Sequence, residues 1–154
     1  MEDQIKPVVQ EIEITCRQTN PQIAFRSIAT AEDAVAFLRE IWTKDINIRI
    51  RFYAIYLNHA GAIIGYAEIC AGGITDCPAD LRMAYCLALK ILAPRIIVAH
   101  NRPTGNITIT QADRDIGDRM LEIGKFHNIK FLDHIIFSEQ RFHSMAENSD
   151  ISFK

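Results

Sequence analysis

The sequence predicts an α/β fold in which a mixed central sheet is flanked by helices. Short apolar runs of strand length alternate with longer segments whose apolar residues recur at helical spacing. Near both ends of the chain two strand-like runs follow one another without a helix, which favours antiparallel hairpins there. The chain has 154 residues, 49% of them hydrophobic and 23% charged, so we expect one compact domain with its own core.

The N-terminal part is expected to hold one strand followed by one helix. Residues 7–16 alternate enough to form an edge strand, which would pair with its own sheet or with another chain. We interpret residues 1–27 as an accessory strand and loop, and residues 28–150 as the domain proper. Thr30 and Asp33 form a capping box, and apolar residues follow it at helical spacing: Val35, Leu38, Ile41 and Trp42.

A hairpin is predicted after this helix. Residues 48–57 alternate at first, with Ile48 and Phe52 on one face, and then become apolar throughout, as a strand does on entering a core. Asn58–Gly61 is a hairpin turn signal, residues 62–70 form the partner strand, and two glycines end it.

The second half is expected to alternate between helices and strands. In chain order, the predicted elements are a helix over 79–92, a strand over 95–99, a loop over 100–109, a helix over 111–127, a strand over 130–137 and a strand near 141–146. Asn128 is a suitable stop for the second of these helices, because asparagine tolerates the left-handed backbone of a helix C-terminus.

The bulk properties exclude several classes of protein. No stretch approaches the roughly 18 apolar residues of a membrane span, and the acidic N-terminus carries no apolar segment of a secretory signal. The net charge of -2 gives no global attraction to nucleic acid. The four cysteines show neither a C-x-x-C pair nor zinc-ribbon spacing, so we expect reduced thiols in a cytoplasmic protein.

The most informative stretch follows the apolar run over residues 95–99. His100 stands at the end of this predicted strand, a Pro/Gly turn follows, and Asp113 lies in the first turn of the next predicted helix. Such a layout brings an imidazole and a carboxylate to one point, as in a metal-hydrolase site. However, Arg102, a cation, stands where a second metal ligand would be expected.

Three motifs carry a resemblance to a known family. They are A-H-N-R-P-T-G over residues 99–105, L-D-H-I-I over residues 132–136, and the glycine pair that ends the second hairpin strand. In these motifs, from about Ser27 to Glu147, the chain resembles the RadC-like branch of the JAB/MPN domain family, relatives of the JAMM metallopeptidases. The resemblance implies a cytidine deaminase-like JAB/MPN fold. It also implies a Zn²⁺ site of two histidines and one aspartate, with a glutamate as general base and a serine that positions the reacting oxygen.

Carried over onto this sequence, the resemblance makes His100 and Asp113 metal ligands and places Thr110 at the serine position. Arg102 occupies the position of the second histidine, and Ile50 occupies that of the glutamate. A divalent ion and a guanidinium about 4 Å apart repel by roughly 8 kcal/mol at an effective dielectric of about 20. We therefore expect zinc to be absent or weakly bound, and hydrolase activity to be lost or impaired.

Each of these residues also has a purely structural explanation. Thr110 and Asp113 satisfy a capping box without any metal, and His100 is as easily a hydrogen-bonded structural histidine. His134 lies off the metal motif, where local structural bonding is the simpler expectation. Glu68 is the nearest carboxylate that would replace the missing base, although a surface charge explains it equally well.

Three functions follow from these observations. The first is a binding or scaffold module for an unknown protein or anionic ligand, in which Arg102 and His100 supply anion-binding donors near a helix N-terminus. The second is a zinc-dependent metallopeptidase-type hydrolase with a variant site. The third, implied by the resemblance, is a DNA-associated protein of the RadC DNA-repair type. The sequence offers it only scattered cations: Arg49, Arg51, Arg114, Arg119 and Lys125. A homo-oligomer stays open.

Overall fold

The computed structural model describes residue 11, residues 26–42 and residues 45–153. The predicted strand over residues 7–16 and most of the accessory segment 1–27 lie outside the described residues. Within the described ranges the elements are, in chain order, α1 (Ala31–Ile41), β1 (Arg51–Leu57), β2 (Ile63–Ala71), α2 (Leu81–Lys90), β3 (Arg95–Asn101), α3 (Gln111–His127), β4 (Lys130–Phe137) and β5 (Phe142–Ser144).

The strands form one mixed sheet in the order β2-β1-β3-β4-β5. Strand β1 is antiparallel to both of its neighbours, β3 and β4 run parallel, and β5 returns antiparallel to β4. This arrangement confirms the predicted mixed sheet with antiparallel hairpins at its two ends. The helix α3 makes the one crossover that the parallel pair needs.

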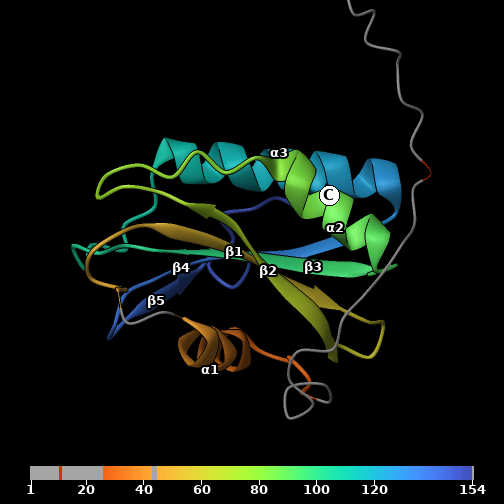
Figure 1. Cartoon of the computed structure of the whole chain (residues 1–154), viewed down its shortest axis with the longest axis horizontal. Coiled ribbons are helices and arrows are strands. Elements are labelled where there is room, and N and C mark those ends of the chain that lie inside the picture. The colour runs from red at the N-terminus through yellow and green to blue at the C-terminus, as the bar shows by residue number, and fades with distance from the viewer. Residues whose placement is uncertain (1–10, 12–25, 43–44, 154) are drawn as a thin grey trace, which may run out of the picture.

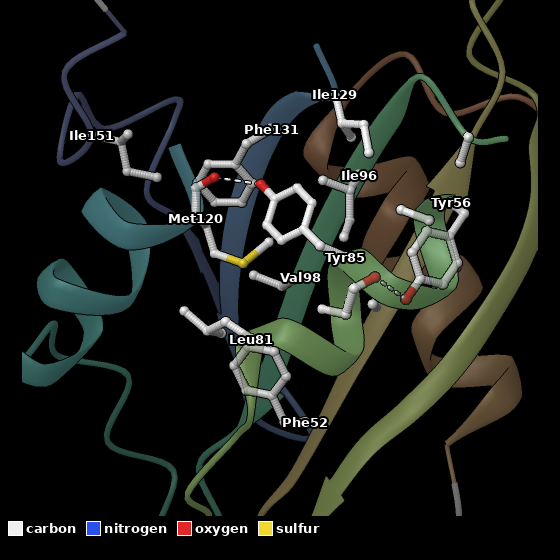
Figure 2. Packing of buried hydrophobic residues seen from close by; sticks show 14 of the residues in the cluster. Phe52, Tyr56, Leu81, Tyr85, Ile96, Val98, Met120, Ile129, Phe131 and Ile151 are labelled. Carbon is white, nitrogen blue, oxygen red and sulfur yellow. Dashed lines mark hydrogen bonds between the residues drawn. The ribbon is translucent and has the colours of Figure 1, made fainter. Parts of the chain in front are cut away.

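Helices cover both faces of the sheet (Figure 1). Helix α1 covers one face, where Phe37, Leu38 and Ile55 are buried in one apolar cluster. Helices α2 and α3 cover the other face, where Tyr56 and Met120 belong to a second cluster. Figure 2 shows this second cluster from close by, with the Tyr56 hydroxyl donating to the Ala84 carbonyl at 2.8 Å. Each layer therefore buries the apolar stripe that the sequence pattern assigns to it.

Local signals set the helix ends as the sequence predicts. Thr30 and Thr110 are the N-caps of α1 and α3, each in a complete capping box with the aspartate three residues on. Asn128 ends α3 with φ 56°, in the left-handed conformation that asparagine tolerates. No helix among the described residues has the length and apolarity needed to cross a membrane.

Two predicted strand boundaries are wrong. Strand β1 begins at Arg51 rather than at residue 48, and Ile48 is 62% exposed. The reason is a turn, since the backbone N–H groups of Ile48 and Arg49 both donate to the Asp45 carbonyl. Strand β3 extends to Asn101, so that His100 lies inside the strand rather than after it.

Candidate functional site

His100 is held in the sheet on the face that α2 and α3 cover. Its register partner on β1 is Phe52, and the two rings stack with centroids 6.1 Å apart and an interplanar angle of 6°. His100 is 5% exposed, so its imidazole is largely removed from water. The strand thus places one predicted site residue rigidly within the core.

Asp113 reaches the same point from the first turn of α3. Its Oδ2 accepts hydrogen bonds from the backbone N–H and the hydroxyl of Thr110, both at 2.8 Å. Its Oδ1 lies 3.4 Å from Nε2 of His100. Asp113 therefore caps the helix and faces the imidazole. The Thr110 hydroxyl donates its hydrogen bond to this carboxylate.

Arg102 completes the group. Its backbone N–H donates to the Phe137 carbonyl. The N–H of Gly105, whose φ is 79°, donates to the Arg102 carbonyl and closes a turn. Its Nη2 lies 2.6 Å from Oδ2 of Asp113, with the Arg102 side chain 22% exposed and the Asp113 side chain 5% exposed. The guanidinium therefore points into the site and forms a mostly buried ion pair there.

His134 also belongs to this group, although its place outside the metal motif favours local structural bonding rather than a part in the site. It lies on β4, is fully buried, and its Nε2 is 2.9 Å from Nδ1 of His100. Only the parallel pairing of β3 with β4 could have indicated this contact, because it places the two histidines on neighbouring strands. The second imidazole thus comes from the L-D-H-I-I motif, not from the position that Arg102 occupies.

The pKa of each of the two imidazoles is lowered, which favours the neutral form. Burial, followed by the charges of His134 and Arg102, lowers the pKa of His100 well below its usual value. Burial also lowers the pKa of His134, although Asp113 opposes that effect. We assign the hydrogens from the network: Nε2–H of His100 faces Asp113, and Nε2–H of His134 donates to Nδ1 of His100. Nδ1 of His134 is buried, has no hydrogen-bond partner of ordinary geometry, and lies near the Asp113 backbone.

These donors do not fit a zinc ion. Asp113 faces Nε2 of His100 whereas His134 faces Nδ1, so the two potential co-ligands lie on opposite edges of one ring. The Arg102 guanidinium is bonded to the other oxygen of the same carboxylate, Oδ2, so the Asp113 charge already has a cation beside it. In the described part of the chain, no group of three or more histidine, cysteine, aspartate or glutamate side chains is placed to hold a metal. Structural and catalytic zinc sites use three or four protein ligands.

Neither of the two positions considered for the general base, Ile50 and Glu68, places a carboxylate on this face. Ile50 is buried, and its backbone pairs with Gly72 and Gly73 at the end of β2. Glu68 lies on the opposite face, where its carboxylate accepts from the Tyr53 hydroxyl at 3.0 Å and from Arg51 at 2.6 Å. Burial and this carboxylate raise the pKa of Tyr53 to about 12. Glu68 is therefore directed away from His100.

Asn101, beside His100 in β3, has a structural role that its position in the motif did not reveal. It is fully buried and donates to the carbonyls of Ile46 and Arg49, at 2.6 and 2.9 Å. Its side-chain oxygen accepts the N–H of Arg51 at 2.8 Å. Asn101 thus fixes the turn that leads into β1.

Three of the cations considered for DNA binding are held in ion pairs, the first of them Arg49 with Asp45 at 3.6 Å. Arg51 bonds Asp45 and Glu68 at 2.7 and 2.6 Å, and Arg114 bonds Asp150 at 3.0 Å. Their charges are therefore balanced within the chain, which leaves less positive potential for phosphates.

Comparisons with known proteins agree with this fold. A family model described as RadC-like JAB domain matches residues 28–150. A UPF0758 protein of Flavobacterium johnsoniae is 28% identical over 141 residues, which cover 91% of this chain and 61% of that protein. A UPF0758 protein of Syntrophomonas wolfei is 32% identical over 122 residues, covering 78% of this chain and 52% of the relative. The UPF0758 protein YfjY of Escherichia coli is 32% identical over 100 residues, covering 65% and 62%. The chain thus spans about half to three fifths of the length of these relatives.

Proposed function

The chain belongs to the family of RadC-like JAB domains, and from this premise we propose that it is a binding or scaffold module without zinc-dependent hydrolase activity. The observation that carries the proposal is the contact of 2.6 Å between Nη2 of Arg102 and Oδ2 of Asp113. This contact gives Asp113 the positive charge that a metal ion would otherwise supply. Arginine keeps its charge at any physiological pH, so the site cannot release it by losing a proton.

The remaining chemistry of the site supports the same proposal. Water activation by a metal needs an open coordination position and a base to accept the proton. Ile50 offers no such base, and Thr110 donates its hydroxyl to Asp113. The group His134–His100–Asp113–Arg102 is instead a compact cluster in which the Asp113 charge is paired with that of Arg102.

Within this proposal the partner is another protein rather than a small anion. The two donors expected to bind an anion, Arg102 and His100, both face the Asp113 carboxylate, which would repel an incoming negative charge. His100 is also buried and neutral, so it adds no positive charge. Recognition would then use the surface of the domain rather than the former metal pocket.

Metal analysis of the purified chain, followed by zinc titration, tests the proposal. We expect far less than one zinc per chain, and no zinc binding that depends on His100. Arg102→His should create a site of two histidines and one aspartate and raise binding toward about one zinc per chain. Arg119→His, on the exposed face of α3, is the matched control and should bind none specifically. About one zinc per native chain, lost in His100→Ala, would support the variant metallopeptidase instead.

The DNA-associated alternative has a separate test. Binding through phosphates weakens steeply as salt is raised, because each contact releases counterions. A salt-dependent affinity for duplex DNA that is lost in Arg119→Ala or Lys125→Ala would support this alternative. The pairing of Arg51 and Arg114 with carboxylates leads us to expect only weak binding.

A further inference from the structure

Two of the cysteines lie together at the end of β2, beside the site. Along β2, Ile69 is skipped in the pairing with β1, since Phe52 is opposite Cys70 and Tyr53 is opposite Glu68. Such a bulge turns the next side chain to the other face of the sheet. Cys70 therefore packs with Ile69 against the apolar cluster under α2 and α3, whereas Glu68 points to the face of α1.

The chain then folds back so that Cys77 meets Cys70. Gly72 donates to the Ile50 carbonyl at 2.8 Å, and Gly73 donates to the Asp76 carbonyl at 2.9 Å. A Cβ on Gly72 would lie 2.7 Å from Cα and from Cβ of Cys77, so only glycine permits this close approach. The Cys77 thiol therefore lies beside Cys70, and both residues pack against the same apolar cluster.

We propose that Cys70 and Cys77 form a reversible disulfide by exchange with a low-molecular-weight disulfide such as oxidised glutathione. One protein thiolate attacks a glutathione sulfur, forming a mixed disulfide and expelling one glutathione thiolate. The second protein thiol loses its proton to water and attacks the protein sulfur of that mixed disulfide, expelling the second glutathione. Two protein thiols are oxidised, and one glutathione disulfide is reduced to two thiols.

The surroundings of the pair set its behaviour. Burial, followed by the neighbouring Cys70 thiol, raises the pKa of Cys77 to about 12, so this thiol ionises reluctantly and exchange is slow near neutral pH. Both cysteines are partly buried, whereas Cys86 on α2 is exposed. The structure thus separates a paired, sheltered dithiol from an exposed single thiol.

The disulfide would act on the site through Phe52. Cys70 is the register partner of Phe52 on one side, and His100 is its register partner on the other. The Phe52 ring stacks on the imidazole of His100. Closing the loop between residues 70 and 77 would fix the strand end next to this stack, and reduction would release it.

Mass spectrometry of the full chain tests the proposal. The double variant C16S/C86S keeps only the two cysteines of the pair; it is equilibrated, folded, in buffers of reduced and oxidised glutathione, and free thiols are alkylated. Digestion before aspartate cuts the chain at Asp76, between the two cysteines. We expect two peptides joined by a disulfide, lighter by two hydrogens than their sum, and separated by dithiothreitol. Adding Cys70→Ser should abolish the link.

Three results would overturn the proposal. The first is that both cysteines of the folded chain are still alkylated as free thiols, or carry only separate glutathione adducts, in the oxidising buffers. The second is that the linked peptides form in urea but not in the folded chain. In the native sequence, the linked pair should far exceed any link to Cys86; equal amounts would also overturn it, because they would reflect random oxidation.

Discussion

Replacing Arg102 by methionine tests directly whether its guanidinium serves as the counter-ion of Asp113. Methionine keeps the apolar stem but removes the charge, and it leaves a carboxylate that is 5% exposed without a cation. Unit charges about 4 Å apart interact by roughly 4 kcal/mol at an effective dielectric of about 20. Truncating one partner of a buried pair costs about 3 to 5 kcal/mol. Since Arg102 is 22% exposed, we expect the lower end, about 3 kcal/mol of unfolding free energy.

A double-mutant cycle separates the pair from other effects of the substitutions. The free energy of unfolding is measured by urea denaturation for the native chain, Arg102→Met, Asp113→Asn and the double variant. We expect a coupling free energy of about 2 kcal/mol that changes little between low and high salt, because buried pairs are poorly screened.

A second ion pair provides the matched control. Arg82 and Asp80 are 2.7 Å apart, nearly the same distance, but their side chains are 89% and 42% exposed. The same cycle on this pair should give a coupling free energy close to zero, and added salt should remove any remaining coupling. If Arg102 and Asp113 couple no more strongly than this exposed pair, Arg102 is not the counter-ion and the reasoning for a metal-free site fails.

Three further outcomes follow from the structure. Because the pKa values of His100 and His134 are lowered in the folded chain, the unfolded chain binds protons that the folded chain does not. The stabilisation from the neutral imidazoles is fully present above about pH 6.5, and the free energy of unfolding should decrease below that pH by about 1.4 kcal/mol per pH unit for each imidazole. A free energy of unfolding, measured by urea denaturation, that stays constant from about pH 6.5 to about pH 5 would contradict this. Gly72→Ala places a Cβ 2.0 Å from a backbone oxygen and should cost about 2 kcal/mol by urea denaturation, whereas Gly73→Ala meets nothing and should change stability by less than about 0.5 kcal/mol. Asn101→Ala leaves three backbone groups at the turn that leads into β1 without their hydrogen-bond partner. It should lower the free energy of unfolding by about 3 kcal/mol and speed amide exchange in that turn, and unchanged exchange would count against this role.

The order and type of the elements could be predicted because each has a local cause. Capping boxes begin two helices, a left-handed asparagine ends one, and apolar runs of strand length lie between them. The start of β1 could not be predicted, because residues 48–52 alternate as a strand would. The start of β1 is set by two hydrogen bonds to the carbonyl of Asp45. The alternation of apolar and charged residues does not reveal these bonds.

The site was predictable where it depends on spacing along one segment, and not where it depends on register between strands. His100, Arg102 and Asp113 come together as the motif indicates. The contact of His134 with His100 depends on the β3–β4 pairing, which contains an irregularity at Ile96 and Ile97. The face of Glu68 depends on the irregularity at Ile64 near the start of β2, because one skipped residue reverses the side chains that follow it.

The ion pair between Arg102 and Asp113 also supplies positive charge at this carboxylate without a diffusible component. A site that needs a bound ion is stabilised in proportion to the logarithm of the free ion concentration, so chelation or scarcity weakens it. The charge that Arg102 supplies is covalently part of the chain and has no dissociation equilibrium. The positive charge beside Asp113 is therefore present at any free-metal concentration.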